Sequence, residues 1–298
     1  MFQPEVRMPD LQKLIELSKD RQYDVYTRFD WPAQVPQDRL WCDEDLLTTY
    51  GTDVHATLTE VELIALSKWE AINFYSLNVH GIKDALGFVC RKMYDKRYKD
   101  YTEYMHIFLA EENAHMWFFA KFCLDYGGRI YKTVAYKDDP ASGNELLSDL
   151  FMFSSTLIFE EFVDFYNRKV GENVAVPPIV REINWQHHRD ESRHMKFGRD
   201  VVKDIFTELR NTTPDWDGTG AKVDTTIKRI FMYFIDLLYN PHAYADARVF
   251  HTPLAPSAAQ TRNYLRNAPE RRPYHELWFK RTARYFESIG AITDAEFI

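Results

Sequence analysis

The sequence predicts an all-α protein built on a four-helix bundle with additional helices. Apolar residues recur at helical spacing along four long segments, and no stretch shows the alternation of apolar and polar residues that is typical of strands. The connectors between these segments are short, as in bundles of antiparallel helices. The four segments cover approximately residues 57–93, 102–126, 145–169 and 179–209.

Residues 1–55 precede the first of these segments, and we expect them to wrap irregularly around the bundle. Several prolines fall in this part of the chain, and each proline lacks the backbone N–H that a helix interior needs. They are Pro4, Pro9, Pro32 and Pro36. The first core helix is then predicted to begin near residue 57 and to continue through Gly81 and Gly87.

Polar or glycine-containing connectors mark the ends of the predicted core helices. The stretch YDKRYKD (94–100) separates the first two helices, and the GG pair at 127–128 stops the second. A turn-rich stretch, KDDPASGN (137–144), leads to the third helix. Pro177 and Pro178 suit the start of the fourth helix.

Further helices are predicted beyond the loop 211–220, and nothing in the composition divides the chain into two domains. The apolar stretch IFMYFIDLLY (230–239) contains Asp236 and is too short to cross a membrane, so we interpret it as a buried helix. The predicted additional helices are 222–239, 256–267 and 273–288. We therefore expect one domain over residues 1–298, with its core at 57–209 and the additional helices at 222–298.

The composition excludes several classes of function. The formal net charge is −8 and no block of Lys and Arg is present, so a nucleic-acid partner is not expected. The 3 cysteines are scattered, without a Cys-x-x-Cys pair, which favours a reducing, cytoplasmic location over a disulfide framework. No basic segment followed by an apolar one opens the chain, so no secretory signal is predicted.

Two of the predicted core helices carry a Glu-x-x-His motif on an apolar face. In the second helix, Glu112 and His115 share a face with apolar residues only. A buried carboxylate on such a face needs compensation, which a metal ion provides. The apolar residues are Met105, Phe108, Phe119 and Phe122.

The fourth helix repeats this arrangement with Glu191 and His194, and His187 adds a third possible ligand one turn earlier. One such pair arises by chance on many helices, but two of them on apolar faces of long helices indicate a dimetal centre. Bundles of this kind pair each Glu-x-x-His helix with a helix that offers one carboxylate.

The third helix offers Glu160 and Glu161 for this role. Residues equidistant from the turn of an antiparallel hairpin lie at the same height. The connector 171–178 therefore places Glu191 level with about residue 158. Both glutamates fit this height, and the apolar pattern does not separate them.

The first helix offers no glutamate at the required height. The connector 94–100 places Glu112 level with about residue 82, where the only acid nearby is Asp84, with His80 one turn away. Glu70 has an apolar neighbourhood but lies about twelve residues away, roughly 18 Å along a helix. We expect Asp84 to be the first-helix ligand, with Glu70 as the alternative.

The motifs EENAH (111–115), EE (160–161) and HHRDESRH (187–194) together resemble the ferritin-like non-haem diiron oxygenases of the para-aminobenzoate N-oxygenase type. The resemblance covers roughly residues 55–205 and includes the extra histidine, His187. It implies that Glu160, rather than Glu161, is the third-helix ligand. The family also has a first-helix glutamate some thirty residues before Glu112, which this chain lacks.

The resemblance implies two iron ions, with manganese as an alternative metal, and carboxylate and imidazole ligands suit both metals. We expect His115 to bind one metal ion, and His187 and His194 to bind the other. Asp190 and Asp164 are candidates to accept hydrogen bonds from ligand histidines. The implied ligands are Glu112, His115, Glu160, His187, Glu191 and His194; candidate cavity residues are Phe118, Phe119, Phe159 and Trp185.

The implied function is that of an O2-dependent mono-oxygenase that oxidises a small organic substrate, first of all an arylamine at its nitrogen. One alternative is hydroxylation or desaturation of C–H bonds in an apolar or acyl substrate. Another is an iron-binding bundle without oxygenase activity and with a degenerate first metal site. Iron storage or detoxification without an organic substrate is a further alternative. The resemblance further implies an external electron donor and a homodimer.

Overall fold

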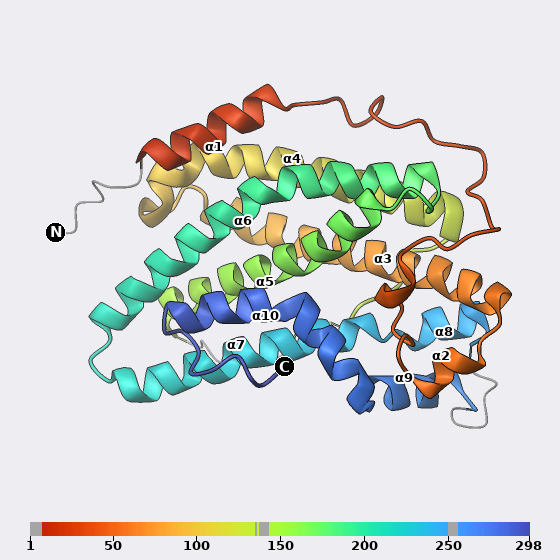
Figure 1. Ribbon diagram of the computed structural model, residues 1–298. Coiled ribbons are helices and arrows are strands. Elements are labelled where there is room, and N and C mark those ends of the chain that lie inside the picture. The colour runs from red at the N-terminus through yellow and green to blue at the C-terminus, as the bar shows by residue number, and fades with distance from the viewer. Residues whose placement is uncertain (1–7, 135, 137–142, 250–255) are drawn as a thin grey trace.

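The computed structural model describes residues 8–134, 136, 143–249 and 256–298, and this part of the chain is helical and contains no strand (Figure 1). The prediction of an all-α, ferritin-like bundle with additional helices is confirmed. Four long helices run through the middle of the molecule. They are α3 (Glu60–Lys92), α4 (Thr102–Phe122), α5 (Glu145–Glu172) and α6 (Pro178–Thr212).

The ends of the core helices follow local sequence signals. Thr59 and Glu62 form a capping box at the start of α3. After α4, the π-helical turn η3 (Cys123–Gly127) is followed by Gly128, whose φ of 67° favours glycine. Pro178 occupies the first turn of α6. Of the loop expected at 137–144, residues 137–142 lie outside the described residues, as does the break expected near residue 254.

The N-terminal part is more regular than predicted, because α1 (Met8–Asp20) is a helix that packs against α4 and α6. Leu11, Leu14, Ile15 and Ser18 follow the spacing of one helical face. The guanidinium of Arg193 in α6 donates to the buried Ser18 hydroxyl over 2.7 Å. The rest of this part contains the short turns η1 (Glu44–Leu46) and α2 (Asp53–Thr57).

The C-terminal helices cover the bundle on the side of α5 and α3 (Figure 1). Helices α7 and α10 pack on α5, and the aromatic rings of Phe162 and Phe279 stack there at 5.1 Å. Helix α8, which the sequence analysis missed, packs on α3. None of the described helices is long and apolar enough to pass through a bilayer. The additional helices are α7 (Trp216–Leu238), α8 (Pro241–Ala247), α9 (Ala258–Asn267) and α10 (Arg272–Ser288).

Helices α3 and α5 approach closely at Gly81. A Cβ atom at this position would lie 2.5 Å from the ring of Phe159 on α5. Only glycine allows this distance, so the absence of a side chain at Gly81 brings the middle of α3 next to the segment of α5 that carries Glu160.

Candidate metal centre

Glutamate and histidine side chains from α4, α5 and α6 converge in the middle of the bundle. They form two groups of possible ligands, and within each group one donor atom per residue lies within 4.8 Å of the others. Glu112 and Glu191 belong to both groups, and all of the residues are buried. The first group is Glu112, His115, His187 and Glu191; the second is Glu112, Glu160, Glu191 and His194.

The first group combines two imidazoles with two carboxylates. His115 Nδ1 lies 2.9 Å from Glu112 Oε1 and 3.5 Å from Glu191 Oε1. His187 Nε2 lies 2.8 Å from the same oxygen of Glu191. The donor groups thus place His187 with His115, whereas the expected sharing of one metal ion by His187 and His194 stays a prediction. Seven residues separate the two along α6, about 10 Å, and His187 faces His115 on the antiparallel α4.

The second group adds the third-helix carboxylate. His194 Nδ1 lies 2.9 Å from Glu112 Oε1 and 3.4 Å from Glu191 Oε2. The structure also separates the two glutamates of α5. Glu161 accepts a hydrogen bond from Arg199 Nε at 2.6 Å and another from the Thr282 hydroxyl at 2.8 Å, whereas Glu160 joins the metal-ligand group.

Many donor atoms of the cluster have no hydrogen-bond partner in the described part of the chain. Buried polar atoms in folded proteins almost always have one. His187 Nε2 and Glu191 Oε1 are only 2.8 Å apart, yet they are not aligned for a hydrogen bond. Atoms that lie this close together without a hydrogen bond between them are suited to bind a shared cation. The atoms are Glu112 Oε2, both carboxylate oxygens of Glu160 and Glu191, His187 Nε2 and His194 Nδ1.

The electrostatics of the cluster favour the binding of positive charge. Burial, together with the neighbouring Glu191 and Glu112, raises the pKa of Glu160 well above its usual value. Burial opposes protonation of His115, but Glu112 and Asp190 outweigh it and raise the pKa of His115 to about 10. Protons on these groups thus balance the carboxylates in the absence of a metal, and a divalent cation can replace them.

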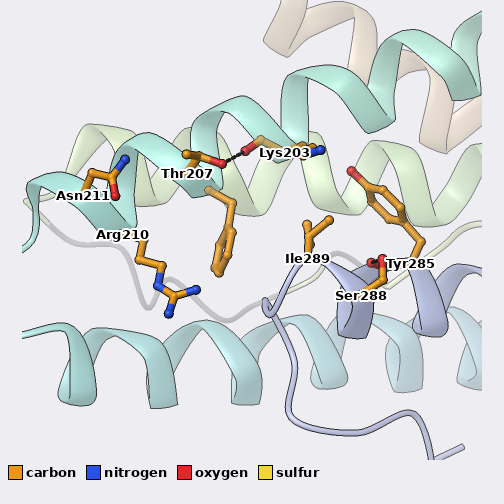
Figure 2. A pocket seen from close by; sticks show the side chains of 8 residues that line it. Lys203, Thr207, Arg210, Asn211, Tyr285, Ser288 and Ile289 are labelled. Carbon is orange, nitrogen blue, oxygen red and sulfur yellow. Dashed lines mark hydrogen bonds between the residues drawn. The ribbon is translucent and has the colours of Figure 1, made fainter. Parts of the chain in front are cut away.

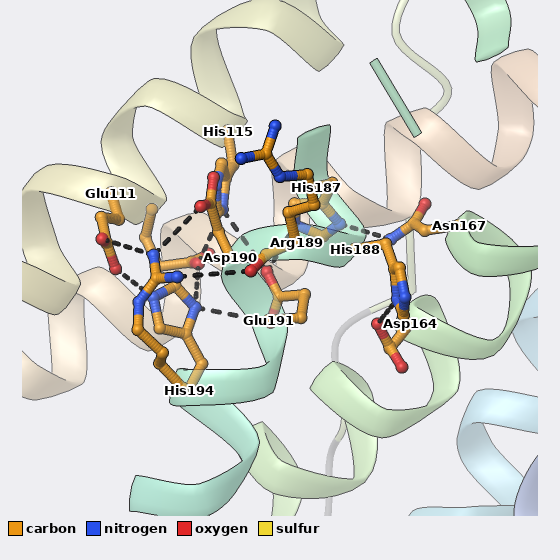
Figure 3. Close-up of polar contacts among 12 residues, drawn as sticks. Glu111, His115, Asp164, Asn167, His187, His188, Arg189, Asp190, Glu191 and His194 are labelled. Carbon is orange, nitrogen blue, oxygen red and sulfur yellow. Dashed lines mark hydrogen bonds and ion pairs between the residues drawn. The ribbon is translucent and has the colours of Figure 1, made fainter. Parts of the chain in front are cut away.

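Two carboxylates that are adjacent in sequence to the ligand glutamates contact two of the histidines. Each contact is to the ring nitrogen that faces away from the cluster (Figure 3). Asp190 Oδ2 lies 3.2 Å from His115 Nε2, and Glu111 Oε2 lies 2.7 Å from His194 Nε2. The arrangement is reciprocal, because each carboxylate holds the histidine of the other helix. Both contacts leave Nδ1 to face the cluster and fix the tautomer that binds metal.

The pair of outer carboxylates is joined by a buried arginine. Arg193 donates to Glu111 Oε1 at 2.8 Å and to Asp190 Oδ1 at 3.0 Å. Although burial works in the opposite direction, hydrogen bonds with His115, Gln186 and Arg193 keep the pKa of Asp190 below its usual value. Burial also raises the pKa of Glu111, but His194 and Arg193 outweigh this effect and lower it, so Asp190 and Glu111 remain anionic acceptors.

The third histidine is held by an amide. Asn167 Nδ2 lies next to His187 Nδ1, while Asn167 Oδ1 is buried without a hydrogen-bond partner among the described residues. The two ends of an amide differ little in shape. If the amide is turned by 180°, Oδ1 accepts the Nδ1–H of His187, and Nε2 becomes the ligand atom. Neither Asn167 nor Glu111 was predicted, since the sequence analysis sought only ligands and acids on the ligand faces.

The two predicted first-helix ligands lie outside the cluster. Asp84 is exposed, because it lies on the face of α3 that points away from the bundle interior. Glu70 is buried but accepts hydrogen bonds from the backbone N–H of Thr48, at 3.0 Å, and from its hydroxyl. Burial raises the pKa of Glu70 to about 7, and the residue borders a separate cavity of about 20 Å³.

Some of the side chains predicted to surround the ligands contact the ligand histidines, and others do not. Asp164 accepts from His188 Nδ1 at 2.6 Å rather than from a ligand histidine. Trp185 is 39% exposed and lies against the same His188, so it does not line the cluster. The rings of Phe118 and Phe119 do contact the histidines: Phe118 lies 5.5 Å from His115 and Phe119 lies 4.9 Å from His187. Phe159 packs between Gly81 and Phe234.

A larger groove lies at the far end of α6, between α6 and α10 (Figure 2). Its volume is about 560 Å³, and Lys203, Arg210 and Tyr285 are among its lining residues. Lys203 follows His194 by nine residues, about 14 Å along a helix. The groove is therefore separate from the cluster.

The chain was compared with models of protein families and with curated proteins. The family model described as p-aminobenzoate N-oxygenase AurF matches residues 5–290. The search of curated proteins finds no significant match. The family match extends over all the core helices and the described C-terminal helices, well beyond the motifs of the cluster.

Proposed function

The chain belongs to the p-aminobenzoate N-oxygenase AurF family, and from this premise we propose that it is an O2-dependent diiron oxygenase that oxidises a small organic amine at nitrogen. The observation that carries the proposal is the pair of overlapping donor groups in the middle of the bundle. Carboxylate and imidazole donors without thiolates suit iron or manganese.

The two donor groups assign some ligands to both metal sites and the others to one site each. Glu112 and Glu191 belong to both groups and would contact both metal ions. His115 and His187 would complete the first site. Glu160 and His194 would complete the second, where the two unpartnered oxygens of Glu160 are available as ligands.

The surrounding side chains prepare these ligands and exclude water. Asp190, Glu111 and Asn167 fix the orientation of the three histidines through their outer nitrogens. Phe118 and Phe119 are fully buried beside the imidazoles. Their rings keep the local environment apolar, which strengthens the attraction between carboxylates and cations.

The bound metal pair would supply the activation of O2. Conversion of an amine to a hydroxylamine uses one O2, two electrons and two protons and releases one water molecule: one oxygen atom forms the new N–O bond and the other leaves as water. The electrons must come from an external reductant. We retain an external electron donor and a homodimer as parts of the proposal.

A second candidate is an iron-binding bundle without oxygenase activity. It is favoured by the lack of a first-helix carboxylate in either donor group of the described residues. Fewer anionic ligands around the first site would weaken its hold on a metal ion.

Anaerobic loading with Fe(II) separates these candidates. We would measure iron per chain after desalting, then add a chemical reductant, 18O2 and p-aminobenzoate as a probe amine. Glu160→Gln and Glu161→Gln form a matched pair, because the two residues are adjacent and buried but only Glu160 belongs to a donor group.

The proposal predicts about two irons per wild-type chain, fewer in Glu160→Gln, and two in Glu161→Gln. It also predicts an 18O-labelled N-oxygenated product. Two irons with no labelled product for any amine tested would support the iron-binding candidate. Wild-type protein that takes up no iron would refute both.

A further inference from the structure

Helix α3 contributes a buried amide to the middle of the bundle where a carboxylate was expected. Asn78 is fully buried, and its Nδ2 donates to the carbonyl oxygen of Phe74 in the same helix at 2.9 Å. That hydrogen bond fixes the amide so that Oδ1 points away from the helix backbone. Oδ1 is buried and has no hydrogen-bond partner in the described part of the chain.

Contacts of Tyr75 place Asn78 at the height of the first donor group. The Tyr75 hydroxyl accepts from Asn184 Nδ2 of α6 at 2.7 Å. Helices α3 and α6 run in the same direction, because both are antiparallel to α4. Three residues further along both helices, Asn78 is therefore level with His187.

A contact with α4 gives the same height. The rings of Tyr75 and Phe119 stack at 5.1 Å. Since α3 and α4 are antiparallel, a residue three positions after Tyr75 is level with residue 116, next to His115. The two neighbouring helices thus agree on the position of Asn78.

The direction of the Asn78 side chain follows from its neighbours on α3. Tyr75 faces α4 and α6, as the contacts above show, whereas Phe74 faces α5 and stacks on Tyr166 at 3.8 Å. At 100° per residue, Asn78 points about 60° from Tyr75 and about 40° from Phe74, in the sector between them. This sector is the bundle interior, enclosed by the three helices that carry the donor groups.

We propose that Asn78 Oδ1 is the α3 ligand of the metal ion held by His115 and His187. An amide oxygen is a neutral donor that suits hard divalent cations. The inference rests on the proposed function, since it assumes that the cluster holds metal. It replaces the expectation that Asp84 or Glu70 supplies this ligand.

An amide ligand in place of a carboxylate changes the net charge of the metal centre. Bundles of this class offer four carboxylates to two metal ions, whereas the donor groups here contain three: Glu112, Glu160 and Glu191. With Asn78 as the neutral contribution of α3, two divalent ions leave a net charge of about +1 rather than zero. The first site should therefore bind divalent metal more weakly than the second, and a carboxylate at residue 78 should tighten it.

The test is metal titration of the whole protein with Co(II), read by absorption and by metal per chain. The wild type should bind two ions in two steps of different affinity. Asn78→Leu removes the donor at similar volume and should lose the weaker step, with an affinity loss of roughly a hundredfold or more, above that seen for residues that only orient ligands. Asn78→Asp should strengthen the weaker step at least tenfold.

A control on the same helix is Asn73→Leu. Asn73 is equally a buried amide, but it donates to the carbonyl oxygen of Leu237 and accepts from Asn240. This variant should be destabilised yet bind two ions with wild-type affinities. Should Asn78→Leu fail to fold, Asn78→Asp still decides the question.

The possible results distinguish a failure of the proposed function from a failure of the role of Asn78. Wild-type protein that binds no metal refutes the proposed function. Wild-type protein that binds two ions refutes only the role of Asn78 if Asn78→Leu binds both equally well, or if Asn78→Asp leaves both affinities unchanged. A wild type that binds one ion also overturns the inference.

Discussion

Replacing Glu111 by leucine tests whether the outer carboxylates control metal binding by the histidines. Glu111 Oε2 lies 2.7 Å from His194 Nε2, and this contact leaves Nδ1 to face Glu112 at 2.9 Å. A hydrogen bond to a charged group contributes about 1.5–3 kcal/mol. Loss of this contact should therefore weaken metal binding about tenfold to a hundredfold, since each 1.4 kcal/mol corresponds to about a factor of ten.

The assay is competition for Co(II) between the protein and a chromophoric chelator. Glu111→Gln should fall between the wild type and Glu111→Leu, because glutamine retains an acceptor but loses the charge. Glu103→Leu is the matched control on the same helix, where the exposed Glu103 pairs only with Lys19 at 2.7 Å among its described contacts. Its metal affinity should equal that of the wild type.

Glu111 also pairs with Arg193 at 2.8 Å, so Glu111→Leu should lower the melting temperature of the metal-free protein. The affinity measurement is made on folded protein, as checked by circular dichroism, and does not depend on this loss. An affinity of folded Glu111→Leu within twofold of the wild type would show that the outer carboxylate does not prepare His194 for metal.

Other changes probe packing, protonation and the corrected contacts. Gly81→Ala should destabilise the fold by about 1–3 kcal/mol, because its Cβ would lie 2.5 Å from Phe159; Gly87→Ala, whose nearest atom is 3.6 Å away, should stabilise it by about 0.5–1 kcal/mol in urea unfolding. Metal binding at pH 7 should release protons and strengthen as pH rises toward 10, since His115, with its pKa raised to about 10, must lose a proton to bind. Calorimetry in two buffers of different ionisation enthalpy measures this release, and no release would contradict it. Asp164→Asn should leave metal affinity unchanged, because Asp164 contacts no ligand histidine among the described residues; a tenfold loss would argue otherwise.

The motifs of α4 and α6 were predictable because their spacing is local. Glu112 with His115, and Glu191 with His194, lie one helical turn apart on apolar faces, so each pair shares a direction whatever the tertiary structure. The partner on α5 was predictable only in height. The apolar pattern left Glu160 and Glu161 open, and only the family resemblance favoured Glu160. The contacts of Arg199 and Thr282 with Glu161 give the physical reason.

The expected first-helix ligands, Asp84 and Glu70, lie outside the cluster, and the sequence could not show this for two physical reasons. The length of the hairpin connector indicates a height but no direction, and Asp84 lies nine residues after Tyr75, about 180° around the helix from the face that meets α4 and α6. The prediction was also restricted to acids, whereas a buried polar group in this region is the amide of Asn78. Trp185 was misplaced in a similar way, since it points about 160° away from His187.

The helix α1 was missed because the proline count of residues 1–55 was applied to the whole segment. Leu11, Leu14 and Ile15 carry the helical spacing, and the described part of α1 begins before them. Its contact with the cluster is indirect, through Ser18 and Arg193. That link depends on tertiary packing and has no local signature.

Anomalous diffraction from crystals of the metal-loaded protein would locate the bound ions. We predict two anomalous peaks that share Glu112 and Glu191, one beside His115 and His187 and the other beside Glu160 and His194. A single peak elsewhere in the molecule, or crystals loaded with excess metal that show no peak at these side chains, would contradict this prediction.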